Sequence, residues 1–285
     1  KVGSFGVGLG YIGSLIAASS GIILLSVVGR VGMFKITAVL FLIFAIPCFI
    51  WVKDANPGKL RIDPKAIFGS FGQMKRTIVK TRQFPGLSRF FIGRIFYTDA
   101  VNTLIILMSI YVTNELGFTD EQAQLILMVA ILFSIMGTIV WGLIVDNIGP
   151  KRCLNLVLYI WMIVLVGVSL IPLLNLPGGL IWVVAAMAGI AMGGTWCADR
   201  PYLLRLVPKE YAGEFFGVYS MVGRFATIAG PLIWVFFADI LGLGRPIAVL
   251  ALLVLVIISY FILRGVSDSP RTFPDSLTNR PAQLP

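Results

Sequence analysis

Long apolar runs separated by short polar segments dominate the pattern along this chain. Each run approaches the roughly 20 residues that an α-helix needs to cross the hydrocarbon core of a membrane. Backbone amides in that core bond only within their own segment, so each run is predicted to be a helix. The pattern therefore predicts an all-α membrane protein with eight transmembrane helices, at residues 6–28, 34–52, 90–112, 122–145, 154–174, 180–206, 215–237 and 247–263.

The composition supports a membrane protein and excludes several other classes. Of the 285 residues, 58% are hydrophobic and only 13% are charged, whereas soluble domains carry about 25% charged residues. The chain has no histidine, which removes His-based catalytic triads and most zinc sites. Its three cysteines lack C-x-x-C spacing, so we expect neither a metal site nor a bound cofactor.

The lysine and arginine residues predict an orientation for the bundle. If Lys1 lies inside, most of the 23 basic residues fall in connections or ends on the inner side, and only Arg30 and Arg245 fall clearly outside. Cytoplasmic loops of membrane proteins carry such an excess of positive charge. The distribution predicts a multi-pass protein with both ends in the cytoplasm, and it explains the net charge of +10 without nucleic acid.

One long polar connection, residues 53–89, divides the runs into two and six. Asp63 followed by Pro64 is a favourable helix start. Apolar residues then recur at helical spacing among basic ones, which predicts an amphipathic helix on the membrane surface, although a solvated basic linker fits the same residues. The resulting domains are 1–52 with two helices, 53–89 as the linker, 90–264 with six helices, and 265–285 as a disordered cytoplasmic tail.

A short repeat relates the two groups of runs. Phe5-Gly6-Val7 opens the first run and Phe216-Gly217-Val218 opens the seventh, and each is followed by a Gly-rich stretch and one further run. If the last six runs form one unit, the first two correspond to positions five and six of an earlier unit. Tandem six-helix halves occur in secondary transporters. We therefore expect four further N-terminal helices of the same protein to be partners of this chain.

The connection after the fourth run carries a motif with a physical rationale. Gly142 lets helices approach closely, and Gly149 allows a tight turn. Asp146 can accept hydrogen bonds from a helix N-terminus or an arginine, and Lys151 and Arg152 fix the topology. The segment resembles the G-x-x-x-D-x-x-G-x-[KR]-[KR] motif of the major facilitator superfamily, which implies a cytoplasmic gate latch. An ordinary short basic loop is the alternative.

Further segments are similar to the vacuole-effluxer-like branch of that superfamily. This branch includes a fungal vacuolar amino-acid effluxer and many bacterial members. The resemblance implies eight helices of a twelve-helix bundle: the last two of the N-terminal half and the complete six-helix C-terminal half. At Asp199-Arg200 the chain departs from the small polar pattern that is usual in the family. The matching segments are Gly10-Tyr11-Ile12-Gly13 and residues 96–104, 198–210, 214–220 and 230–232.

Charged side chains inside the runs are the strongest candidates for function, because they are costly in a membrane. Asp99 and Arg224 each lie about ten residues into a run from its cytoplasmic end, which is close to the midplane at 1.5 Å per residue. We hypothesise that they face one cavity and form a pair that opens during transport or proton binding. A fixed ion pair that only holds two helices in register is the alternative. Asn102 shares a helix face with Asp99, and Arg94 lies nearer the interface, where it can snorkel.

Three aromatic residues, Tyr97, Trp196 and Tyr219, are candidates to line the same cavity, although a buried aromatic is more often part of the core. Few polar groups occur in the runs, which favours a small zwitterionic or amphiphilic solute. Residues 8–13 match the dinucleotide fingerprint G-x-G-x-x-G. That fingerprint needs a soluble βαβ unit, so these glycines are expected to serve helix packing.

Together these patterns predict a secondary transporter of the major facilitator type in a bacterial inner membrane, working by alternating access around a midplane site. Proton or ion coupling through Asp99 is part of this hypothesis. A polytopic membrane enzyme is one alternative, but only Asp199 and Arg200 offer catalytic groups near an interface. A non-transporting scaffold is the other. The predicted solute or ion pathway comprises Arg94, Tyr97, Asp99, Asn102, Trp196, Tyr219 and Arg224.

Overall fold

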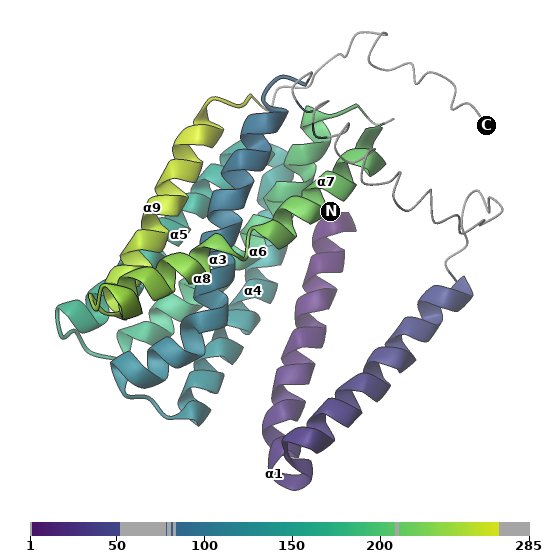
Figure 1. Cartoon of the computed structure of the whole chain (residues 1–285). Helices are drawn as coiled ribbons and strands as arrows, with labels where there is room; N and C mark the ends of the chain where they lie inside the picture. The colour runs from purple at the N-terminus through teal and green to yellow at the C-terminus, as the bar shows by residue number, and fades with distance from the viewer. Residues whose placement is uncertain (1, 52–77, 79–80, 82–83, 209–210, 268–285) are drawn as a thin grey trace.

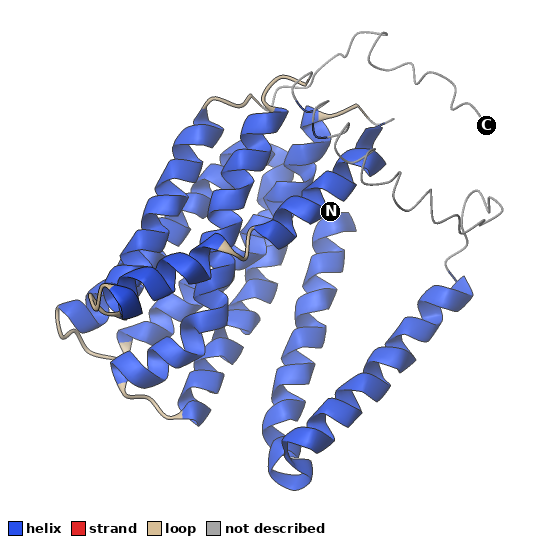
Figure 2. Ribbon diagram, viewed as in Figure 1, coloured by secondary structure: helices blue, strands red, loops and turns tan. Residues whose placement is uncertain are grey.

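The computed structural model describes residues 2–51, 78, 81, 84–208 and 211–267, and no strand occurs among them (Figure 1). Helices make up nearly all of this part of the chain, as Figure 2 shows. Most of the predicted linker, with its amphipathic helix, and most of the predicted tail lie outside the described residues, so the domain boundaries stay predictions. The helices are α1 (Val2–Trp51), α3 (Leu87–Leu116), α4 (Asp120–Ile148), α5 (Pro150–Leu173), α6 (Leu180–Leu206), α7 (Ala212–Phe225), α8 (Ala229–Val235), the π-helix η3 (Phe236–Ile240) and α9 (Arg245–Arg264).

Six described segments are long and apolar enough to cross a membrane. They coincide, to within about one helical turn, with the last six predicted runs. The chain is therefore an integral, multi-pass membrane protein. The segments are α3, α4, α5, α6, the stretch Ala212–Ile240 that contains α7, α8 and η3, and α9.

The first two predicted runs form the two arms of α1, which meet at Gly29. Gly29 has φ 66 and ψ 177, a backbone conformation that favours glycine. The first arm, residues 2–28, and the second arm, residues 30–51, therefore point in different directions (Figure 1). The apolar helix Val31–Pro47 in the second arm is shorter than the usual span. That both arms cross the membrane stays a prediction.

Sequence patterns often mark where the helices begin and end. Thr119 and Gln122 form a capping box at the start of α4, in which each side chain bonds the other residue's backbone N–H. Proline at the first position of α5, Pro150, fits there because that N–H has no helical partner. Gly117 ends α3 with φ 71. These signals fix the helix lengths that bring the polar residues of neighbouring helices to the same depth.

The seventh run differs from the prediction, because the structure breaks it into pieces. The continuous helix expected at 215–237 is interrupted between Phe225 and Ala229, and it ends in η3. Pro231 has no N–H to donate to the carbonyl of Thr227, so the helical ladder is weakened at this point. Broken helices are tolerated in membranes only where other groups satisfy the released backbone atoms. The break is therefore a place to look for polar side chains.

Glycines let α4 and α6 pack with their backbones in contact. A side chain at Gly189 would collide with the backbone of Ala130, and a Cβ at Gly193 would lie 2.6 Å from the backbone oxygen of Ser134. Gly189 and Gly193 are four residues apart and lie on one face of α6, opposite Ala130 and Ser134, which are also four apart. Such small residues are the usual means of close helix packing in lipid. The α4–α6 seam is thus the tightest backbone contact of the bundle.

Contacts between distant segments define two ends of the six-helix unit. At the first end, Lys151 Nζ donates to the backbone oxygen of Arg264 at 2.9 Å, joining the start of α5 to the end of α9. At the second end, Arg245 Nη1 lies 3.0 Å from Glu115 Oε1, joining the start of α9 to the end of α3. Helices thus start and finish at alternate ends, as in the topology predicted from the sequence. In that prediction the first end is the cytoplasmic one.

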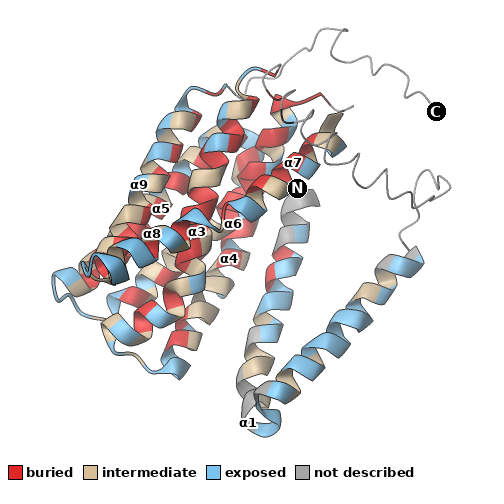
Figure 3. Cartoon of the chain, in the orientation of Figure 1, coloured by how far each residue is buried: buried red, intermediate tan, exposed pale blue. Residues whose placement is uncertain are grey.

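Apolar side chains cover the outside of the bundle as well as its interior. Figure 3 shows buried residues concentrated between the helices and exposed ones on the outer faces. The exposed fractions of Ile106, Ile139 and Phe261 are 59%, 61% and 62%. Such faces suit lipid tails, so burial of apolar area alone does not hold these helices together. Close packing and buried polar contacts must do so.

We expect Gly193→Ala to destabilise the bundle, because its methyl group would overlap the backbone of α4. Overpacking of this kind costs about 1–3 kcal/mol. Gly213→Ala is the matched control, since a Cβ there meets no atom of the described residues within 4 Å. Thermal unfolding of the purified protein in detergent checks the prediction. Equal melting temperatures for the two variants would contradict the α4–α6 seam.

Candidate functional site

An ion pair between α3 and α6 lies inside the bundle. Arg94 Nε donates to Asp199 Oδ2 at 2.9 Å, and the two side chains are 3% and 0% exposed. The two residues are 105 positions apart in the chain. Arg94 is the seventh residue after Leu87 and Asp199 the seventh before Leu206, and both helix ends lie at the first end of the bundle. The pair therefore sits about two turns inside the membrane-spanning segments.

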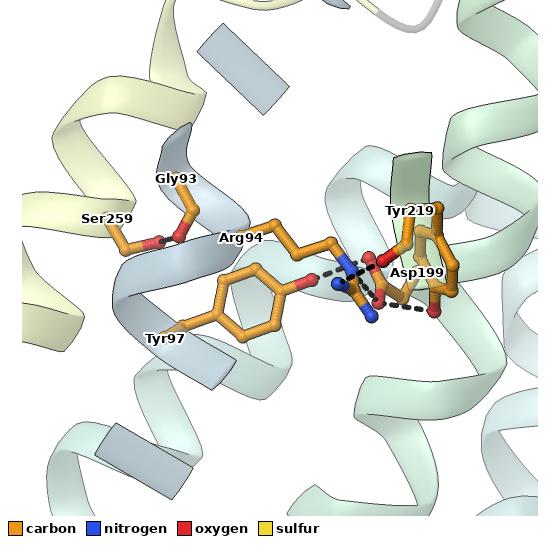
Figure 4. A network of polar contacts seen from close by, with 6 residues as sticks. All are labelled: Gly93, Arg94, Tyr97, Asp199, Tyr219 and Ser259. Atoms are coloured by element: carbon orange, nitrogen blue, oxygen red, sulfur yellow. Dashed lines mark hydrogen bonds and ion pairs between the residues drawn. The ribbon is translucent and has the colours of Figure 1, made fainter. Parts of the chain in front are cut away.

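Two tyrosines complete the polar cluster around this ion pair (Figure 4). The hydroxyl of Tyr97 donates to Asp199 Oδ1 at 2.5 Å, and the hydroxyl of Tyr219 donates to Asp199 Oδ2 at 2.8 Å. Arg94 Nη1 donates to the backbone oxygen of Tyr219 at 3.0 Å, and its guanidinium carbon lies 3.6 Å from the Tyr219 ring centre. Arg94, Tyr97, Asp199 and Tyr219 form what we call the charge cluster, which links α3, α6 and α7.

Small residues make room for the charge cluster. A Cβ on Gly223 of α7 would lie 3.0 Å from Arg94 Nη1, so glycine lets the guanidinium reach the α7 backbone. On the other side of α3, a side chain at Gly93 would meet Leu263 of α9 at 2.7 Å. Ser259 of α9 donates to the backbone oxygen of Gly93 at 2.8 Å (Figure 4). These contacts fix the depth and rotation of α3, and hence the position of Arg94.

The structure corrects the expectation for Arg94 and adds a residue that the sequence analysis did not include. Arg94 does not snorkel to the interface; its pairing with Asp199 inside the bundle is more favourable than extension along the helix. From the sequence, Asp199 was expected near an interface, with Arg200, as a candidate group of a membrane enzyme, and it was not included among the pathway residues. The helix continues to Leu206, however, and this leaves Asp199 well inside the membrane. The sequence signal that could have paired Arg94 with Asp199 is their equal distance, in residues, from the first end of the bundle.

A second polar group lies where α3 passes the break between α7 and α8. In a continuous helix the N–H of Gly230 would donate to the carbonyl of Ala226, four residues earlier. Instead, Asn102 Nδ2 donates to the Ala226 oxygen at 3.3 Å. This side chain of α3 thus replaces the donor that the break removes. Asp99 lies three residues earlier on the same face of α3.

Several polar atoms beside the break have no hydrogen-bond partner among the described residues. Asp99 is 2% exposed, and its Oδ1 atom is one of them; the hydroxyl groups of Thr98 and Thr103 are the others. A side chain at Gly230 would collide with the Thr103 hydroxyl, so the start of α8 lies directly against α3. Buried polar atoms are rarely left unpaired, so this stretch of α3 is a candidate for a function beyond packing.

The predicted pairing of Asp99 with Arg224 is not formed in the described residues. Arg224 is exposed on α7, whereas Asp99 is buried against the start of α8. The two residues face different directions because the break turns α8 toward α3 while α7 keeps Arg224 on its outer side. Trp196 is also separate from the charge cluster: it is half-buried and lies beside Tyr11 of α1. The structure therefore divides the predicted pathway residues into several groups.

The predicted gate motif forms the turn between α4 and α5 at the first end. Gly149 has φ 87, and its N–H donates to the backbone oxygen of Val145 at 3.1 Å. Gly142 is buried, while Asp146 and Arg152 are exposed. Lys151 bonds the end of α9, as described above. The motif thus connects three helices at the first end, and its function as a latch stays a prediction.

The described residues contain no group of three or more Cys, Asp and Glu side chains placed to hold a metal ion. The charge cluster pairs one carboxylate with one guanidinium, and Asp199 accepts its hydrogen bonds in the cluster from the N–H of Arg94 and the hydroxyls of Tyr97 and Tyr219. This arrangement can bind and exchange charged or hydrogen-bonding groups. It offers no position for a metal between its ligands.

We expect Arg94→Gln to lower the free energy of unfolding by about 3–5 kcal/mol, because it leaves the buried Asp199 carboxylate without its cation. Adding Asp199→Asn removes the uncompensated charge and should restore part of the loss. Arg245→Gln is the control, since its pair with Glu115 is 30% and 25% exposed and such pairs contribute about 0–1 kcal/mol. Unfolding in detergent measures all four proteins. A double variant less stable than Arg94→Gln alone would contradict the prediction.

Comparison with known proteins identifies relatives along nearly the whole chain. The chain is 30% identical over 282 residues to the uncharacterized MFS-type transporter YxiO of Bacillus subtilis (strain 168), covering 95% of this chain and 64% of that protein. It is 26% identical over 302 residues to autophagy-related protein 22-1 of Penicillium rubens, covering 95% and 50%. An uncharacterized protein of Aquifex aeolicus is 26% identical over 257 residues, covering 90% and 62%.

The chain thus spans between half and somewhat less than two thirds of the length of these relatives. The family model described as vacuole effluxer Atg22 like matches residues 1–272. This agrees with the branch of the major facilitator superfamily that the sequence motifs resemble. The chain belongs to the vacuole effluxer Atg22-like family.

Proposed function

We propose that the protein containing this chain is a secondary transporter of the major facilitator type, which moves a small zwitterionic solute such as an amino acid by alternating access. The observation that carries the proposal is the charge cluster. An ion pair removed from water is costly, and charged groups inside membrane bundles characteristically mark solute or ion pathways. The relative named as an MFS-type transporter supports the same function.

The chemistry of the charge cluster fits a zwitterion. Arg94 presents a planar guanidinium, which can bind a carboxylate through two parallel hydrogen bonds. Asp199 offers a carboxylate that can bind an ammonium group. The hydroxyls of Tyr97 and Tyr219, which donate to this carboxylate, can keep or give up their hydrogen bonds when it binds the ammonium group. A bound amino acid would exchange the Arg94–Asp199 pair for two pairs with the solute. This substitution keeps every charge paired throughout the exchange.

Arg224 supports an aqueous pathway beside α7. Its side chain is exposed at the end of α7, close to the break and far from the polar ends of the span. An arginine facing lipid there would be costly, so such residues normally face the bundle interior or a water-filled cavity. We propose that this face of α7 turns toward N-terminal helices of the same protein, with a solute pathway between them. Tyr219 and Asn102 would lie on the side of this pathway that faces the six-helix unit.

Alternating access would use the difference between a rigid part of the six-helix unit, at α4 and α6, and a part that can bend, at α7 and α8. The α4–α6 seam is closely packed, whereas α7 and α8 are separated by a break. The gate motif at Gly142, Asp146, Gly149, Lys151 and Arg152 would hold the first end closed in one state. We propose that this end faces the cytoplasm of a bacterial cell, in line with the excess of basic residues there.

The alternative functions receive less support. A membrane enzyme would use Asp199 and Arg200 near an interface, but Asp199 is buried and accepts bonds from Arg94, Tyr97 and Tyr219. A scaffold would not require charged residues inside the spans, and Asp99 and Arg94 are both buried there.

Transport by the full-length protein in proteoliposomes tests the proposal. We expect exchange of at least one labelled amino acid from a panel, and we expect Arg94→Lys to raise its KM by about tenfold or more, because lysine lacks the two-pronged geometry of arginine. Arg245→Lys, at the second end, should leave the KM unchanged. A flat result over the panel would refute the amino-acid assignment, and an unchanged KM in Arg94→Lys would refute the role of the charge cluster.

A further inference from the structure

Two tyrosines lie together on the outer side of the seam between α5 and α9, where Tyr159 is exposed and Tyr260 is partly exposed. The hydroxyl of Tyr159 donates to the hydroxyl of Tyr260 at 2.5 Å, and their ring centres are 5.0 Å apart. The hydrogen of the Tyr260 hydroxyl has no acceptor among the described residues. A polar group beside lipid tails is costly unless it is hydrogen-bonded. The pair therefore offers one hydrogen-bond donor to a group outside this chain.

Two exposed arginines lie beside the tyrosines at the first end of the bundle. Arg264 follows Tyr260 by four residues, so it lies on the same face of α9, about 6 Å nearer the first end. Arg152 precedes Tyr159 by seven residues, which is about two turns along the same face of α5. The two faces meet at this end, because Lys151 Nζ donates to the backbone oxygen of Arg264. The side chains of both arginines are exposed, and neither has a hydrogen-bond or ion-pair partner among the described residues.

The two helices offer no anion to these arginines. Neither α5 nor α9 contains an acidic residue. Two neighbouring cations instead lie at the C-terminus of α9, where backbone carbonyls concentrate negative charge. Lys151 bonds the Arg264 oxygen, and a Cβ on Gly265 would lie 2.9 Å from Arg89 Nη1. Arg152 and Arg264 are thus available to an anion from outside the described chain.

We propose that Arg152, Arg264 and Tyr260 bind the phosphate group of an anionic phospholipid, and we call these three residues the lipid site. A guanidinium can bind two phosphate oxygens through parallel hydrogen bonds. The Tyr260 hydroxyl would donate to a further oxygen of the same headgroup. Tyrosines are enriched at the membrane interface, and arginines extend their charged ends toward it. Basic pockets between helices on the cytoplasmic side bind anionic headgroups, and the first end is the one predicted to be cytoplasmic.

The surroundings of the lipid site favour a phospholipid over a free phosphate ion. Exposed apolar side chains continue the two faces from the tyrosines further into the span, where they can contact acyl chains. A free ion would contact only the polar groups at the first end, whereas a phospholipid would contact both parts. The exposed apolar residues of the two faces are Leu156, Ile163, Ile258 and Phe261.

Native mass spectrometry of the purified full-length protein in detergent, with added dioleoyl phospholipids, tests the proposal. We expect phosphatidylglycerol to bind about fivefold more tightly than phosphatidylcholine, because choline places a positive charge beside the phosphate. Arg152→Gln and Arg264→Gln should each weaken phosphatidylglycerol binding by about fivefold. Replacing Tyr159 and Tyr260 together by phenylalanine should weaken it by about threefold or more, because both donors are lost. Arg205→Gln is the matched control, since it removes a charge at the same end from the last turn of α6, and it should leave the affinity unchanged.

Three results would overturn the lipid site. They are equal affinities for the two phospholipids, an equal loss of affinity in Arg205→Gln and Arg264→Gln, and displacement of phosphatidylglycerol by millimolar inorganic phosphate, which would assign the arginines to a free anion. If the arginine variants do not fold, the double phenylalanine variant decides, and an unchanged affinity refutes the site. Because no transport is measured, failure here is distinct from failure of the proposed function.

Discussion

The interior of a bilayer offers no water, and every polar group of this bundle must find its partner within the protein. The charge cluster meets that requirement with one ion pair and two tyrosines. The α7–α8 break meets it with a side chain of α3. Hydroxyl groups on the spans follow the same rule: Ser134, Thr138, Ser169 and Thr195 each donate to the carbonyl four residues earlier. Among the described residues, five buried side-chain atoms have no partner, and three of them lie on α3, at Thr98, Asp99 and Thr103.

Helix α3 is the element that both polar groups share. Arg94 and Tyr97 reach α6 and α7 from its first half, and Asp99 and Asn102 reach the break slightly further along. Gly93 and Ser259 hold the opposite side of α3 against α9. A small rotation of α3 would therefore change the charge cluster and the break together.

The sequence predicted the last six membrane spans to within about one helical turn, because the length and polarity of a segment are local properties. It also singled out Arg94, Tyr97, Asp99 and Asn102 as candidates, since polar residues in apolar runs are conspicuous. It did not predict their partners. Arg94 and Asp199 are far apart in the chain, and hydropathy does not tell which helices are neighbours. The hypothesis of an Asp99–Arg224 pair rested only on the similar depth of the two residues in the membrane. The pair that forms, Arg94–Asp199, lies at similar depth and also at the interface between α3 and α6.

The break in the seventh run was visible as a cluster of glycines with Pro231, but its effect depends on tertiary contacts. Pro and Gly are tolerated inside membrane helices when neighbours replace the lost hydrogen bonds. Only the position of Asn102, which donates to the Ala226 oxygen, shows that this happens here. The same holds for Gly193, since the absence of a side chain there matters only because α4 packs against it.

The break also gives α7 a mechanical property. With 14 residues, α7 is about 21 Å long at 1.5 Å per residue. A change of about 20° in the bend, the size of an ordinary helix kink, would carry its far end through about 7 Å. A rearrangement of the hydrogen bond between Asn102 and Ala226 at the break would therefore be amplified into a movement of several ångström at the far end of α7.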